Sequence, residues 1–149
     1  MDLDERAYRE GCAILDIQTS ALRRYGEIVA AQGAALGADD MDRVADLAEH
    51  VDRLIAELSA SGRRMAPLHD RLREGRLAGP RAEALRARTD AIGDLAGAAE
   101  RAVRGLVSEL VRRRNDVRRQ LATLDAAAVA GTSYAVAAAS PRGAFDRLI

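Results

Sequence analysis

Hydrophobic residues recur at steps of three and four positions through nearly the whole chain, and they never alternate with polar residues for long. This spacing places apolar side chains on one face of an α-helix, whereas a half-buried strand needs strict alternation. The pattern therefore predicts an all-α protein, an elongated antiparallel three-helix bundle or coiled coil with an overhanging third helix. We expect one helical bundle domain over residues 1–130 and a partly mobile tail over residues 131–149.

The first helix is predicted over about residues 4–36. It ends at Gly37-Ala38-Asp39-Asp40, where Gly37 can end one helix and an Asp can cap the next. Because the break has only about four residues, the neighbouring helices are expected to run antiparallel. The apolar face of this helix consists of Tyr8, Gly11, Ile14, Leu15, Ala21, Leu22, Tyr25, Ile28, Val29 and Leu36.

The second helix, over about residues 40–74, carries the most regular repeat. Pro67 interrupts it, but the heptad stays in phase on both sides, so we expect one helix that is kinked near Gly62 to Ala66. The alternative is a helix that ends near Ser61 and a short separate helix after Pro67. The coiled-coil seam has Val44, Val51, Leu58, Met65 and Leu72 seven positions apart, with Leu47, Leu54, Ser61 and Leu68 three positions later.

The third helix is predicted over about residues 80–127, with Pro80 at its first position. At about 1.5 Å per residue it spans roughly 70 Å, against roughly 50 Å for each of the others. It should therefore overhang them by about a dozen residues. Its apolar face is interrupted by Arg113 and Arg114, and it consists of Leu85, Ile92, Leu95, Ala99, Val103, Leu106, Leu110, Val117, Leu121 and Leu124.

The overhang carries Val117, Leu121 and Leu124 on one stripe that has no partner inside the bundle. Burying each such side chain is worth about 1.5–3 kcal/mol, so an exposed stripe needs an explanation. Three remain open. Two chains could pair through their overhangs, or the stripe could bind an apolar helix of another protein, which we favour because the tail is alanine-rich. In the third, the tail folds back and covers the stripe with Tyr134, Val136, Phe145 and Leu148.

Composition narrows the functional classes. The 149 residues include 23 basic and 23 acidic side chains, and 48% are apolar, so the chain is expected to fold. A lone Cys12 cannot form an internal disulfide, and we find neither a signal segment nor a membrane-spanning run. These features predict a cytoplasmic protein without membrane insertion.

The charge is unevenly distributed. Residues 39–58 hold seven acids and two Arg, whereas residues 63–88 hold eight Arg and three acids. In an antiparallel bundle such blocks can set helix pairing and register. The run Arg112 to Arg119 is the best nucleic-acid candidate, but no aromatic stacking residue interleaves with it. We therefore expect no nucleic-acid partner.

No catalytic motif is found, so we expect neither an enzyme nor a cofactor. There is no Gly-rich phosphate loop, no Cys pair at zinc spacing and no Gly-x-Ser-x-Gly. His50 follows Asp46 by four residues, but this spacing also fits an acidic solvated face, and we expect no metal site. Cys12 is expected to be a small buried hydrophobe.

The layout resembles the FlgN-type flagellar export chaperones, small cytosolic all-helical proteins. The resemblance covers most of the chain and rests on a long first helix that ends at Leu36-Gly37-Ala38-Asp39-Asp40 and a second that begins Met41-Asp42-Arg43-Val44-Ala45-Asp46-Leu47. The third helix closes with Arg114-Asn115-Asp116-Val117-Arg118-Arg119-Gln120-Leu121-Ala122-Thr123-Leu124. Tyr134 and Phe145-Asp146-Arg147 follow it.

The resemblance implies a chaperone that binds an amphipathic helix of a secreted flagellar hook-associated protein and prevents its premature assembly. It also implies a contact of Tyr134 with the export gate; packing of Tyr134 back on the bundle is the alternative. The expected oligomeric state is a monomer or a weak homodimer. The alternative function is a structural coiled-coil adaptor that dimerises along the seam from Val44 to Leu72. The predicted partner-binding residues are Leu110, Val117, Leu121, Leu124 and Tyr134.

Overall fold

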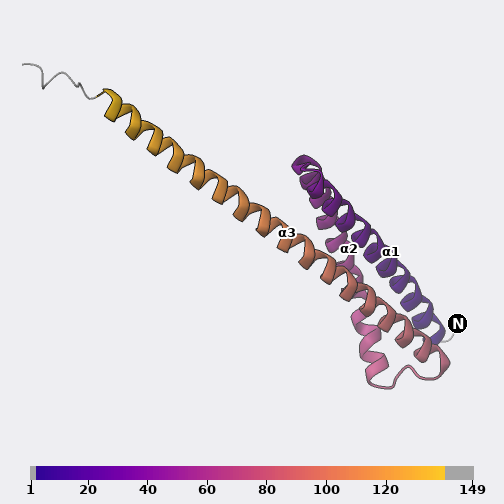
Figure 1. The fold of residues 1–149 in the computed structure, drawn as a ribbon. Helices are drawn as coiled ribbons and strands as arrows, with labels where there is room; N and C mark the ends of the chain where they lie inside the picture. The colour runs from indigo at the N-terminus through magenta and orange to yellow at the C-terminus, as the bar shows by residue number, and fades with distance from the viewer. Residues whose placement is uncertain (1–2, 140–149) are drawn as a thin grey trace, which may run out of the picture. The chain divides into compact units, whose positions relative to one another are not determined.

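The computed structural model describes residues 3–139, which form three helices and, over that range, no strand. These are α1 (Leu3–Gly37), α2 (Met41–Arg73) and α3 (Pro80–Ala139), shown in Figure 1. The predicted all-α helical bundle is therefore confirmed. The third helix has 60 residues, against 35 and 33 for the first two.

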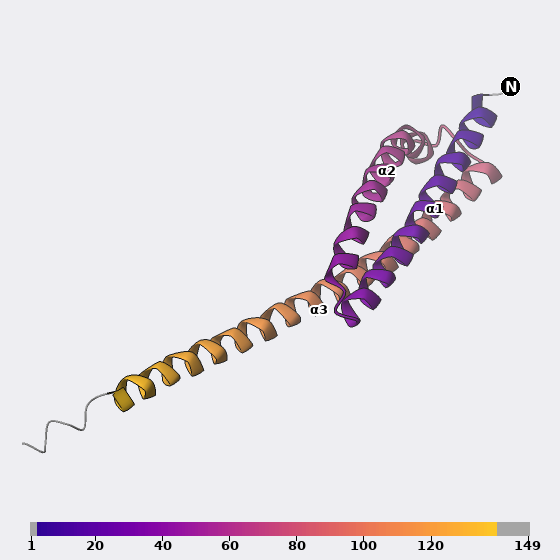
Figure 2. The same cartoon turned by 90° about the horizontal axis from the view of Figure 1, so that it is seen from above.

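The chain divides into two compact units. The first unit, Met1–Val107, contains α1, α2 and the beginning of α3, and the second unit, Ser108–Ile149, contains the rest of α3. In both Figure 1 and Figure 2, α1, α2 and the beginning of α3 lie side by side. Three-helix packing is thus a feature of the first unit.

The connection between α1 and α2 is a short capped turn. Asp39 adopts a left-handed backbone conformation with φ 63°, whereas Gly37, expected in the turn, is the last residue of α1. Asp is one of the few residues with a side chain that adopts this conformation readily. Asp40 caps α2 as predicted, because its carboxylate accepts a hydrogen bond from the backbone N–H of Arg43 at 2.9 Å.

The second helix runs unbroken through Pro67, so the alternative of two separate helices does not form. Proline lacks an N–H, and the carbonyl of Arg63 therefore loses its usual partner in the helix. Packing of the predicted seam against the rest of the first unit holds the two halves of α2 together. The buried residues of α2 all belong to this seam: Leu47, Leu54, Ser61, Met65, Leu68 and Leu72.

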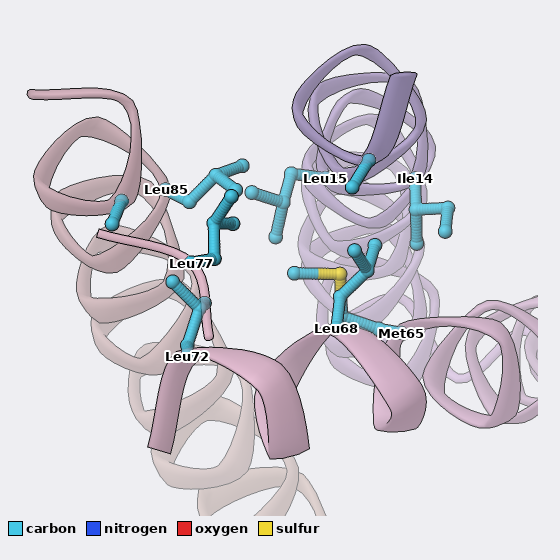
Figure 3. Close-up of a cluster of buried hydrophobic side chains, with 9 residues drawn as sticks. Ile14, Leu15, Met65, Leu68, Leu72, Leu77 and Leu85 are labelled. Carbon is cyan, nitrogen blue, oxygen red and sulfur yellow. The ribbon is translucent and has the colours of Figure 1, made fainter. Parts of the chain in front are cut away.

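The main core lies where the three helices meet, near the Pro67 end of α2 (Figure 3). Leu77, which lies outside the predicted helices, is buried in the turn between α2 and α3. Gly75 and Gly79, with φ of 69° and 76°, let this short turn fold inward. The labelled core residues are Ile14 and Leu15 of α1, Met65, Leu68 and Leu72 of α2, Leu77, and Leu85 of α3.

Helices α1 and α3 approach each other closely at Gly11. A Cβ atom built on Gly11 would lie 3.0 Å from Cδ2 of Leu85, tighter than ordinary van der Waals contact. Glycine therefore occupies a position at which a side chain would push the two helices apart.

The ion pairs between helices connect α1 with each of the other two. Nη2 of Arg71 in α2 lies 2.9 Å from Oδ1 of Asp4 in α1. Nη1 of Arg24 in α1 lies 3.8 Å from Oε2 of Glu57 in α2. On α3, Arg81 pairs with Glu5 and Arg88 pairs with Asp16. The charge blocks at residues 39–58 and 63–88 were expected to set helix pairing and register, and the members that form these pairs bind α1: Glu57, Arg71, Arg81 and Arg88. They are largely exposed, so each contributes little to stability.

The end of α3 corrects the predicted boundary. The helix was expected to stop near residue 127 and give way to a mobile tail, but it continues to Ala139. Alanine has the highest helix propensity, and the alanines after Asp125 outweigh the cost of Gly131, about 1 kcal/mol. The hydroxyls of Thr132 and Ser133 bond back to the carbonyls of residues 128 and 129 at 2.9 and 3.0 Å. The rest of the predicted tail, including Phe145 and Leu148, lies outside the described residues.

Candidate functional site in the second unit

Four of the five predicted partner-binding residues are exposed on α3 within the second unit. The exposed fractions are 53% for Val117, 55% for Leu121, 65% for Leu124 and 78% for Tyr134. Leu110, the fifth, is half-buried. Tyr134, expected in a tail, is part of the helix, and its side chain is exposed there.

The exposed apolar residues follow a heptad. Leu110, Val117 and Leu124 are seven positions apart, and Leu121 lies four after Val117. Such a spacing places all four side chains on one stripe of the helix. We call these four residues the α3 stripe. A single helix cannot bury its own stripe, so this surface is available to a second helix.

Arginines and a few acids border the stripe. Arg112 bonds Glu109 through two nitrogens at 2.8 and 2.9 Å, and Nε of Arg113 bonds the same carboxylate at 3.2 Å. These hydrogen bonds hold the pKa of Glu109 below its usual range. Arg119 pairs with Asp116 one turn earlier. The exposed side of this segment is thus charged, as a solvated helix face requires.

Three charged residues near the stripe make no ion pair within the described part of the chain: Arg114, Arg118 and Asp125. Arg114 interrupts the stripe between Leu110 and Val117, as the sequence predicted. An unpaired charge beside an exposed apolar surface remains available to a partner.

Val111 and Val129 are further exposed apolar residues of the second unit that the sequence pattern did not indicate, and Val136, expected to fold back over the stripe, is also exposed on α3. Val129 and Val136 lie in the segment that was expected to be a tail, and alanines surround them. The signal that could have revealed them was the continued high helix propensity after residue 127.

An apolar hollow with a volume of about 250 Å³ lies at the surface of the first unit. Leu22 and Tyr25 belong to the predicted apolar face of α1, and in the structure they line an open space beside Ile55, which is itself exposed. The lining comes from all three helices and includes Leu58, Ala99 and Val103.

His50 and Cys12, the candidates for metal or thiol chemistry, each contact a neighbouring group of the protein. Nδ1 of His50 lies 2.9 Å from the backbone carbonyl oxygen of Asp46. Residues 3–139 contain no group of three or more His, Cys, Asp or Glu arranged to hold a metal ion. Cys12 is half-buried against the core, and its hydrogen bond with Tyr8 raises the pKa of that phenol.

Within the same residues, none of the three helices combines the length and apolar character that crossing a membrane requires. No protein-family model, curated protein or solved structure matches the chain.

Proposed function

We propose that this protein is a cytoplasmic export chaperone that binds an amphipathic helix of a secreted flagellar hook-associated protein. In this role it covers the client's apolar face and prevents premature assembly. The observation that supports the proposal is the exposed α3 stripe: an apolar face at helical spacing on a helix that belongs to a folded protein. The resemblance to the FlgN-type chaperones supplies the kind of client.

A partner that covers the α3 stripe would bury apolar surface that is now exposed to water. Each of Val117, Leu121 and Leu124 exposes more than half of its surface, and covering these residues with an apolar helix releases water from them. A client helix with apolar anchors at positions i, i+3, i+4 and i+7 matches their spacing. Such binding requires no catalytic group or cofactor, so the proposed function is not enzymatic.

Tyr134 supports the second part of the proposal, a contact with the export gate. Its ring is the most exposed of the large apolar side chains in the described part of the chain, and it lies ten residues after Leu124. An exposed tyrosine offers both an apolar ring and a hydroxyl to a partner. We propose that it remains accessible when a client covers the stripe.

The alternative function, a structural adaptor that dimerises along the α2 seam, has less support. That dimer would need Leu47, Leu54, Leu68 and Leu72 at its surface, but these side chains are buried in the first unit. Exposing them would unfold the core that contains them.

The experiment compares two double variants in a binding assay. Leu121→Arg with Leu124→Arg should abolish calorimetric binding to a peptide that spans the C-terminal helix of a hook-associated protein from the source genome. The melting temperature should stay nearly unchanged, because both leucines are exposed. Ala122→Arg with Ala126→Arg adds the same charge outside the stripe and should bind normally.

Full peptide binding by the leucine double variant would refute the proposal. A large drop in its melting temperature would instead show that these leucines belong to a core. A wild-type protein that binds none of the hook-associated peptides would leave the chaperone role without support.

A further inference from the structure

The stripe is part of a longer heptad that runs through α3 from Leu110 to Ala135. This stretch spans between three and four heptads, about 38 Å at 1.5 Å per residue, which is long enough for a coiled coil. In standard heptad notation, its a positions are Arg114, Leu121, Ala128 and Ala135, and its d positions are Leu110, Val117, Leu124 and Gly131.

A parallel pair of these helices is disfavoured by charge. It would place Arg114 of each copy against Arg114 of the other at the same a layer. It would also place Arg113, at a g position, near Arg118 of the second copy at an e position. Like charges at both places repel, and this repulsion acts against the parallel orientation.

An antiparallel pair fits well in one register. When Leu121 of one copy faces Leu124 of the other, each of the remaining larger core residues faces a small one. Arg114 then faces Gly131, where the missing Cβ leaves room for the arginine chain; Gly131 has nothing within 4 Å of its Cβ direction. The remaining layers pair Leu110 with Ala135 and Val117 with Ala128.

The same register also pairs opposite charges. In an antiparallel coiled coil e positions face e positions, and here Arg118 faces Asp125 of the second copy. Two-fold symmetry makes this pair twice. Both residues lack an ion pair within the described residues of the chain, so the dimer would supply the partner that each one needs.

We propose that two copies of this chain pair through residues 110–135 of α3 as an antiparallel two-stranded coiled coil. Each copy then covers the stripe of the other. This inference goes beyond the proposed chaperone function and does not depend on it, because the pairing follows from the helix alone. If the stripe also binds clients, the dimer is the resting state, and a client helix displaces the second copy.

The test is a reciprocal charge swap, followed by light scattering or sedimentation over a range of concentrations. Wild-type protein should form a dimer, and Arg118→Asp or Asp125→Arg should each weaken it about tenfold or more, because two attractions become two repulsions. The double variant R118D/D125R should restore dimerisation, since the swapped charges again face each other. Arg119→Asp makes the same charge change one residue away, at an outward f position, and should leave the dimer intact.

A chain that stays monomeric at every concentration would overturn the inference. So would a dimer that neither single reversal weakens, or a double variant that dimerises no better than the single ones. A helical circular dichroism spectrum for each variant shows that lost dimerisation is not lost folding. Binding of the hook-associated peptide is measured separately, so a monomer that binds it would contradict the dimer but leave the chaperone proposal standing.

Discussion

The two ends of α3 have similar apolar periodicity, but they differ in how deeply their leucines are buried. In the first unit, Leu85 is completely buried between α1 and α2, whereas in the second unit Leu121 and Leu124 are more than half exposed. One continuous helix thus carries a core face and an open face. The difference lies in what surrounds each segment, because the leucine spacing alone does not distinguish them.

A hydrophobic pattern therefore predicts which helix face is apolar, but it does not predict whether that face is buried within the chain. A helix stripe predicts that something covers it, but the cover can come from the same chain or from another molecule. For Leu85 the cover is α1 and the end of α2. For Leu121 and Leu124 we propose a client helix or a second copy.

The largest expected effect separates the two ends directly. Leu85→Ala should lower the free energy of unfolding by about 2–5 kcal/mol, because it leaves a cavity in the core. Leu121→Ala, the same change at the open end, should alter it by no more than about 0.5 kcal/mol. Urea denaturation of monomeric protein, followed by circular dichroism, measures both. Similar losses for the two variants would show that the ends do not differ as described.

Smaller changes in stability, of opposite sign, are expected when two glycines of α1 are replaced by alanine. Gly11→Ala should destabilise the protein by about 1–2 kcal/mol, because the added Cβ presses on Leu85. Gly26→Ala has nothing within 4 Å of the new Cβ and should stabilise by about 0.5–1 kcal/mol through helix propensity. Thermal melts of the two variants give the signs. Stabilisation by both would contradict the close approach of α1 and α3.

The smallest expected effect is a pH dependence of stability that arises from Glu109, in the second unit. Arg112 and Arg113 lower the pKa of Glu109 in the folded helix. Their stabilisation is therefore present above the unfolded pKa of about 4.3, and it is lost as the pH falls through the lower folded value. A carboxyl NMR titration should show the lowered pKa, and Arg112→Gln with Arg113→Gln should raise it. An unchanged pKa in that variant would remove the arginines as its cause.

Much of the fold could be predicted from the sequence because each helix carries a clear local signal. Asp40 and Pro80 mark helix starts, and the α2 heptad stays in phase across Pro67. The end of α3 was predicted too early, because the alanines that continue the helix show high helix propensity without an amphipathic pattern. Leu77 was missed for another reason: its burial depends on how a short turn folds over the core, which periodicity does not describe.

The candidate site was partly predictable as well. Val117, Leu121 and Leu124 were identified because the third helix exceeded its neighbours in length, and their exposure agrees with that reasoning. Tyr134 was named through the resemblance, but its place in a helix was not foreseen. The proposed pairing of Arg118 with Asp125 of a second copy depends on Gly131 and Ala135 lying within α3, which the sequence pattern did not predict.

Hydrogen exchange with and without the hook-associated peptide tests the central claim most directly, at a concentration at which the chain is monomeric. The account predicts that the peptide slows exchange of backbone amides within residues 110–135 and leaves α1 and α2 unchanged. Protection that appears in α1 or α2, with residues 110–135 unaffected, would contradict the assignment of the α3 stripe as the docking surface.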